Sequence, residues 1–301
     1  MDRPSMSFLP PSLVALAQRL GLGPGRHTPR QLLHKARALR LPFQPLPPVQ
    51  ESIWWQADPP LHRLVELPRD ALSGPVQEDK AAARTVLMRL VEREQRSLAG
   101  IDLRQVDGLV GKDLQAVQYD GLEAYSATPE CRAVRIIGYK DFVRTLGQAV
   151  AGFPEAGRLQ LRQAGWRGER LFWAGEPQQL AAFAAAVAYA RRRGLEVIQP
   201  AELTRYRLSE SGLAGLRRRY HVLAMPAQAW SDPAFMGLLL DQGMPYARLA
   251  LLRRSGAPEF LLLPRRHPAA NALGEGLYQA GAPDVTGFLA GLLPDADSAP
   301  G

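Results

Sequence analysis

From residue 133 to residue 281 the chain alternates short apolar segments with segments of helical period, and this alternation constrains the fold more than any other feature. The order strand, helix, hairpin and helix occurs twice, first in residues 133–194 and again in residues 220–281. Strands that alternate with amphipathic helices are typical of α/β proteins, in which helices pack on a sheet. The sequence therefore predicts an α/β fold with a mixed sheet and packed helices, and the two stretches are possible copies of a duplicated β-α-β-β-α unit.

Glycine and proline mark the ends of these elements, as expected for turns and helix ends. The expected elements are a strand at 133–138, a helix at 141–150, a hairpin at 158–163 and 170–174, a helix at 177–193 closed by Gly194, a helix at 209–219, a strand at 221–225, a helix opened by Asp232-Pro233, a hairpin at 246–253 and 260–263, and a helix at 268–279.

The first 49 residues predict a short helical arm followed by a stiff connector. We expect helices at 12–20 and 31–39, the second of them capped by Thr28, and then an extended proline-rich segment at 42–48. The α/β domain follows over residues 50–295, and residues 296–301 are expected to form a disordered tail.

The middle section, residues 50–130, is expected to be mostly helical. A helical period extends over 78–98, and a probable strand lies around 62–67. Charge also distinguishes the sections of the chain. Residues 1–49 carry seven basic and one acidic side chain, a net charge of +6, whereas residues 50–130 carry nine basic and fourteen acidic, a net charge of −5. This opposition predicts that the arm docks on the middle section.

The whole chain has a formal charge of +8, which favours an anionic partner. Lysine occurs four times among the 37 basic residues, so the excess is arginine, and GC-rich coding is an alternative explanation for part of it. Four basic clusters, at 191–193, 217–219, 253–254 and 265–267, lie near helix ends and on a hairpin, and their convergence would form one anion-binding face. The residues expected to bind the anion are Arg217, Arg218, Arg219, Arg265, Arg266 and His267.

No motif for a cofactor or a metal is present, since the chain has no P-loop, no nucleophile elbow and no zinc-ligand spacing. We therefore expect no cofactor and no metal. The single cysteine, Cys131, cannot form a disulfide within the chain and favours a reducing, cytoplasmic location. No apolar run reaches the roughly 20 residues of a spanning helix, so no membrane partner is expected.

Three functions remain open on these grounds. The leading hypothesis is a non-enzymatic binding or regulatory protein that engages nucleic acid or an acidic protein partner through the arginine-rich face. The second is an enzyme acting on a phosphorylated or other anionic small substrate, with Asp141 or His221 as its acid or base. The third is a protein–protein adaptor whose partner contacts are the helical arm and the pair Trp54-Trp55.

Overall fold

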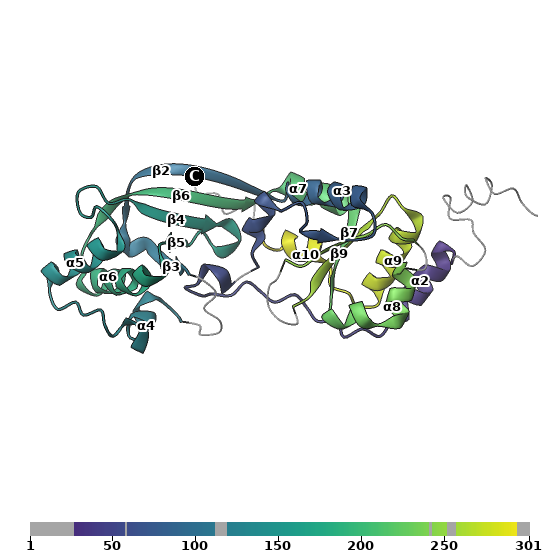
Figure 1. Cartoon of the computed structure of the whole chain (residues 1–301), viewed down its shortest axis with the longest axis horizontal. Coiled ribbons are helices and arrows are strands. Elements are labelled where there is room, and N and C mark those ends of the chain that lie inside the picture. The colour runs from purple at the N-terminus through teal and green to yellow at the C-terminus, as the bar shows by residue number, and fades with distance from the viewer. Residues whose placement is uncertain (1–26, 58, 112–118, 241–242, 252–256, 294–301) are drawn as a thin grey trace, which may run out of the picture.

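Two β-sheets lie end to end along an elongated molecule, each with helices packed against it (Figure 1). The computed structural model describes residues 27–57, 59–111, 119–240, 243–251 and 257–293. The expected α/β fold with packed helices is confirmed. Within the described residues, no helix combines the length and the apolar character that crossing a membrane requires.

The first sheet has five strands in the order β2-β6-β4-β5-β3 and mixes parallel with antiparallel pairs, whereas the second has four antiparallel strands in the order β1-β8-β9-β7. The strands are β1 (Leu72–Ser73), β2 (Val91–Asp102), β3 (Val106–Val110), β4 (Leu159–Ala164), β5 (Leu171–Ala174), β6 (Ile198–Leu208), β7 (Tyr220–Met225), β8 (Ala247–Leu249) and β9 (Glu259–Pro264).

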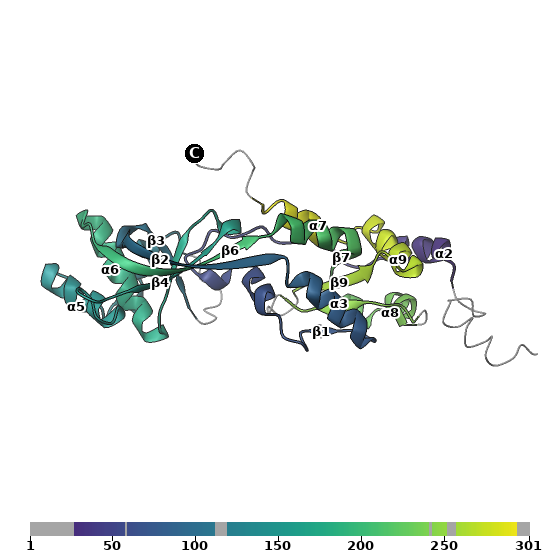
Figure 2. The ribbon, with the colours of Figure 1, turned by 90° about the horizontal axis from the view of Figure 1, so that it is seen from above.

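Helices pack against both sheets (Figure 2). They are α2 (Pro29–Arg37), α3 (Gln77–Leu87), α4 (Leu122–Ser126), α5 (Tyr139–Ala149), α6 (Leu180–Arg193), α7 (Glu210–Arg219), α8 (Pro233–Leu240), α9 (Pro268–Gln279) and α10 (Val285–Ala290).

Three hydrophobic clusters hold these layers together, because successive side chains of a strand point to opposite faces of its sheet. On the five-stranded sheet, α4, α5 and α6 cover one face, where Leu161 of β4 and Trp173 of β5 are buried. On the four-stranded sheet, α2, α8 and α9 cover one face, where Leu261 of β9 is buried. The remaining faces share a central cluster with α3, α7 and α10, to which Phe172 and Val222 contribute from the two sheets.

Several elements form as their sequence predicts, with the local chemistry expected of them. Thr28 caps α2 with a reciprocal capping box, Ser209 caps α7, and Gly194 ends α6 in the left-handed conformation with φ of 64°. Both hairpins are present, since β4 pairs antiparallel with β5 and β8 pairs antiparallel with β9.

The expectation of a duplicated unit in one sheet is wrong. The two hairpins belong to different sheets, and residues 133–138 form no strand. This segment joins the 3-10 helix Pro129–Cys131 to α5 and leaves Ile137 66% exposed, so it never reaches a neighbouring strand with which it could pair. The shared order of elements therefore does not reflect a shared arrangement.

The expected helix over 78–98 is correct only in its first half. Helix α3 ends at Leu87, and the charged run that follows forms β2, which pairs with β6 over most of its length. Glutamate, arginine and glutamine favour helices, but tertiary pairing overrides such propensities. The expected strand at 62–67 is instead the 3-10 helix Leu61–Glu66, in which Leu61 and Leu64 are both buried at the spacing of three that this helix requires.

The helical arm also docks elsewhere than expected. Its second helix, α2, packs against α9 and α8 on the outer face of the four-stranded sheet, not on residues 50–130. Leu32 and Ala36 are fully buried there, and the absence of a side chain at Gly276 lets the two helices approach closely. Apolar burial therefore decides this contact, and net charge does not. The helix expected at 12–20 and the tail at 296–301 lie outside the described residues.

Candidate anion-binding site

The first basic cluster lies at the carboxyl end of α7. Gly212 brings this helix against the backbone of Arg89, because a Cβ at that position would lie 2.0 Å from the Arg89 carbonyl oxygen. The contact fixes where α7 ends, and its last turn carries Arg217, Arg218 and Arg219, all of them exposed. Cations in this position complement the negative end of the helix dipole, which stabilises the helix by about 0.3–1 kcal/mol.

Strand pairing brings the second basic cluster to the same place. Tyr220 opens β7 directly after α7 and lies opposite Pro264, the last residue of β9. The residues just beyond this pair also meet, since the Arg265 amide donates a 2.8 Å hydrogen bond to the Arg219 carbonyl oxygen. Of the four clusters, these two therefore meet, at the edge strand of the four-stranded sheet. The cluster at 191–193 instead ends α6, which packs on the five-stranded sheet, and residues 253–254 lie outside the described residues.

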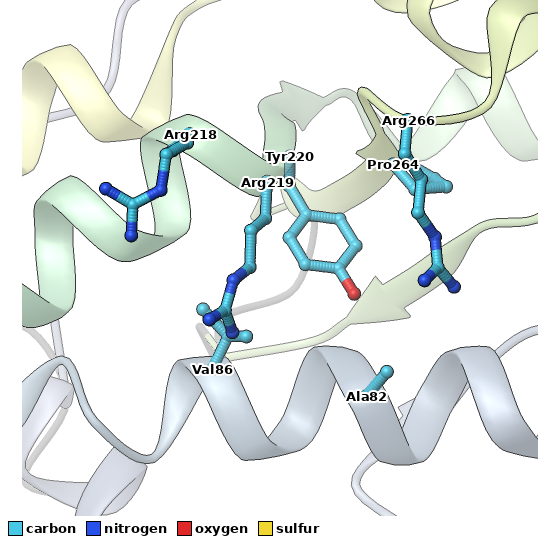
Figure 3. Close-up of a pocket in the computed structure, with 7 residues that line it drawn as sticks. All are labelled: Ala82, Val86, Arg218, Arg219, Tyr220, Pro264 and Arg266. Carbon is cyan, nitrogen blue, oxygen red and sulfur yellow. The ribbon is translucent and has the colours of Figure 1, made fainter.

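A trough runs between these arginines and α3. It consists of two adjoining hollows of about 340 and 410 Å³ that share Pro264 and Arg266. The first hollow is lined by Ala82, Val86, Arg218, Arg219, Tyr220, Pro264 and Arg266, and the second by Val76, Asp79, Gly243, Pro245, Pro264, Arg266 and His267. We call these two hollows together the basic trough. In Figure 3, Arg219 and Arg266 lie on either side of the Tyr220 ring and point toward α3.

The positive charge of the basic trough is not neutralised by ion pairs within the part of the chain that the structure describes. The guanidinium groups of Arg218, Arg219 and Arg266 make no salt bridge there, although Asp79 lines the second hollow. By contrast, Arg191 at the end of α6 pairs with Glu123 at 3.1 Å and donates to two backbone carbonyl oxygens. The trough arginines can therefore serve an external anion.

Tyr220 adds a hydroxyl group to this positive surface. Its ring is almost fully buried, and burial raises the pKa of its phenol above the usual value. The hydroxyl therefore stays protonated at neutral pH and can donate a hydrogen bond to an anion held between Arg219 and Arg266. The sequence does not identify Tyr220 as a site residue, because its pattern is that of an ordinary strand residue. The apolar wall that α3 contributes cannot be predicted from the sequence either, because it depends on tertiary packing.

Two of the residues expected in the anion site have structural roles as well. Arg265 donates from Nε to the Tyr220 carbonyl oxygen at 3.2 Å, and its Nη1 lies 3.2 Å from Nε2 of His221. His267 caps α9, with Nδ1 accepting from the Ala270 amide, while its ring lines the second hollow. Arg217 is exposed on the helix end but lines neither hollow.

The expected partner contact at Trp54 and Trp55 is not supported, because both side chains are core residues. They are 5% and 4% exposed, and the Trp55 ring packs edge-on against Phe172 at 5.4 Å. Two adjacent tryptophans indicated an exposed docking pair, but each ring is buried in a different cluster, on opposite faces of the five-stranded sheet.

The two residues expected as acid or base in an enzyme lie away from the basic trough. Asp141 accepts hydrogen bonds from the backbone amides before α5, which lower the pKa of its carboxyl group and identify it as a helix cap. His221 is buried between β7 and α9, with Nε2 2.9 Å from the Asn271 side-chain oxygen. Neither side chain lines either hollow.

The described residues contain no group of three or more histidine, cysteine, aspartate or glutamate side chains that could hold a metal ion. The fold and the trough together define an α/β protein with an open positive surface at a sheet edge. Residues 95–299 match the model of a family of unknown function (DUF6685), and the chain belongs to this family. No curated protein and no solved structure shows significant similarity to it.

Proposed function

We propose that this chain is a non-enzymatic binding protein that engages a polyanion, either an acidic protein segment or a nucleic acid, through the basic trough. One observation carries the proposal: Arg218, Arg219 and Arg266 converge on one hollow without a carboxylate partner among the described residues. Guanidinium groups pair bidentately with carboxylate or phosphate, so an open cluster of them favours an anionic partner.

The walls of the trough favour an acidic protein segment over a nucleic acid. Val76, Ala82 and Val86 form an apolar side opposite the arginines, which suits a peptide that carries apolar and acidic side chains together. A single-stranded nucleic acid would need aromatic side chains on which its bases stack. The rings that line the trough belong to Tyr220, which is buried, and to His267, which caps α9.

A salt titration tests this function with three labelled probes: DNA, RNA and an acidic polypeptide. Affinity for a nucleic acid should fall by roughly 0.7–0.9 log units per phosphate contact for each tenfold rise in salt. Replacing Arg217, Arg218, Arg219, Arg265 and Arg266 by alanine should flatten the salt dependence for any probe that binds.

The matched control is Arg192→Ala, which removes an exposed arginine from the last turn of α6, away from the trough. Arg192→Ala should leave the binding of all three probes unchanged, because the Arg192 charge lies at the end of α6 and not in the trough. If the wild-type protein binds none of the three probes at low salt, the proposed function is wrong.

A further inference from the structure

Strand β2 leaves one edge of the five-stranded sheet open. It is the first strand in the sheet order and pairs only with β6 among the described residues. The side chains from Glu92 to Ser97 are all exposed, although Arg93 forms an ion pair with Glu66 of the 3-10 helix Leu61–Glu66. A long edge strand presents a row of unpaired backbone groups, which natural proteins normally protect.

The other sheet edges are short or covered. A bridge between Trp54 and Leu109 continues the sheet beyond β3, and the Leu109 amide donates to the Ile53 carbonyl oxygen at 2.7 Å. At β7, the Ala224 amide donates to the Pro283 carbonyl oxygen at 3.0 Å. Strand β1 has two residues. The open edge of β2, twelve residues long, is therefore the exception.

The register with β6 identifies which backbone groups face outward. The Ser209 amide donates to the Leu90 carbonyl oxygen at 2.9 Å, and this pair continues the register in which Val91 lies opposite Leu208. Hydrogen-bonded and non-hydrogen-bonded pairs alternate along an antiparallel ladder. The backbone groups of Glu92, Glu94 and Arg96 therefore face β6, whereas those of Arg93, Gln95 and Ser97 face the open side.

We propose that β2 pairs antiparallel with β2 of a second copy of this chain, about a two-fold axis at Gln95, and so joins two five-stranded sheets into one. In this register Glu94 lies opposite Arg96 of the second copy, and the same pair recurs on the other side of the axis. Arg93 lies opposite Ser97 of the second copy. The outward-facing backbone groups of Gln95 bond to their own counterparts.

Charge selects this register over its neighbours. Glu94 and Arg96 already form a 2.6 Å ion pair within the strand, so the two copies would contribute four charges of alternating sign around the axis. A register shift of two residues, which moves the two-fold axis by one residue, would set Glu94 opposite Glu94 or Arg96 opposite Arg96, and like charges directly opposite are destabilising. The mixed charges of β2 therefore disfavour edge pairing in other registers and permit pairing in this register.

Disulfide trapping tests the register directly, because the natural Cys131 is the single cysteine of the chain and is buried. In a hydrogen-bonded pair the two Cα atoms lie about 5.5 Å apart, which suits a disulfide. The variant Gln95→Cys should therefore form a covalent dimer under mild oxidation. The control Ser97→Cys changes another exposed residue of the same strand, but its two copies would lie about 14 Å apart and should not crosslink.

Light scattering across a wide range of concentrations tests the association itself. Wild-type protein should form a dimer, and Gln95→Pro should be monomeric, because proline removes an outward N–H but leaves the bonds to β6. Glu94→Arg should weaken the dimer about tenfold, and adding Arg96→Glu should restore it. The charge variants keep the test valid if the proline variant fails to fold. A monomeric wild type, or equal crosslinking at Gln95 and Ser97, would overturn the proposal.

Discussion

The backbone amide of Arg265 donates a 2.8 Å hydrogen bond to the carbonyl oxygen of Arg219. This bond joins two basic clusters that lie 46 positions apart in the sequence, one at the end of α7 and one after β9. It continues the ladder between β7 and β9 by one residue beyond Tyr220 and Pro264. The positive charge of the trough is thus a product of strand register.

The hydroxyl of Tyr220 is expected to strengthen anion binding without contributing to the fold. Tyr220→Phe keeps the buried ring and removes the hydrogen bond to the ligand, so affinity should fall about three- to tenfold at unchanged melting temperature. Binding to the preferred probe by fluorescence anisotropy is the measurement. Tyr139→Phe, an exposed tyrosine on α5, is the control. Equal affinities for wild type and Tyr220→Phe would exclude a role for the hydroxyl.

Two glycines on α7 should respond oppositely to alanine. At Gly212 a Cβ would lie 2.0 Å from the backbone oxygen of Arg89, so Gly212→Ala should lower the free energy of unfolding by about 1–3 kcal/mol. Gly215 has no atom within 4 Å of a new Cβ, and Gly215→Ala should raise stability by about 0.5–1 kcal/mol. Chemical denaturation measures both. A neutral Gly212→Ala would mean that α7 is not held closely against Arg89.

Acid should destabilise the protein through His62. Burial, together with the charge of Arg162, lowers the pKa of this imidazole from 6.5 to about 4. The unfolded chain binds the proton more readily than the folded protein does. The free energy of unfolding therefore has its full value above about pH 6.5 and falls by up to about 3 kcal/mol as the pH drops toward 4.

The variant His62→Gln should remove this part of the pH dependence. Urea unfolding at about pH 7 and about pH 4.5 measures the difference for both proteins. Some acid sensitivity should remain, since His221 also has a lowered pKa, caused first by burial. Identical losses in wild type and variant would show that His62 does not titrate as described.

Trp55 is expected to stabilise the core and to play no part in docking. Trp55→Ala should lower the free energy of unfolding by about 3–5 kcal/mol, because it removes a buried ring that contacts Phe172 and Tyr206. The comparison is Tyr278→Ala, since Tyr278 on α9 is 55% exposed and its loss should change stability by less than about 0.5 kcal/mol. Thermal unfolding distinguishes the two, and a stable Trp55→Ala would place this side chain outside the core.

Local patterns determined much of the secondary structure. Thr28 with Pro29, Ser209, and Gly194 fix helix ends through caps and a left-handed residue, which are interactions within a few positions of the chain. The pairing of β4 with β5 also follows from a nearby turn, the 3-10 helix Gly165–Arg167 that ends at the left-handed Gly168. These features can be predicted from one sequence because both partners of each interaction lie close together along the chain.

Tertiary structure decided the remainder. Whether residues 91–98 continue a helix or form β2 depends on β6, more than a hundred positions later, whose ladder offers hydrogen bonds that no local pattern reveals. The sequence identified the arginines of the trough, but not Tyr220 or the α3 wall, because register and packing place them there. The burial of Trp54 and Trp55 could not be predicted for the same reason, because burial is a property of the assembled layers. Side chains next to each other on a strand-like segment can face opposite sides of a sheet, as these two do.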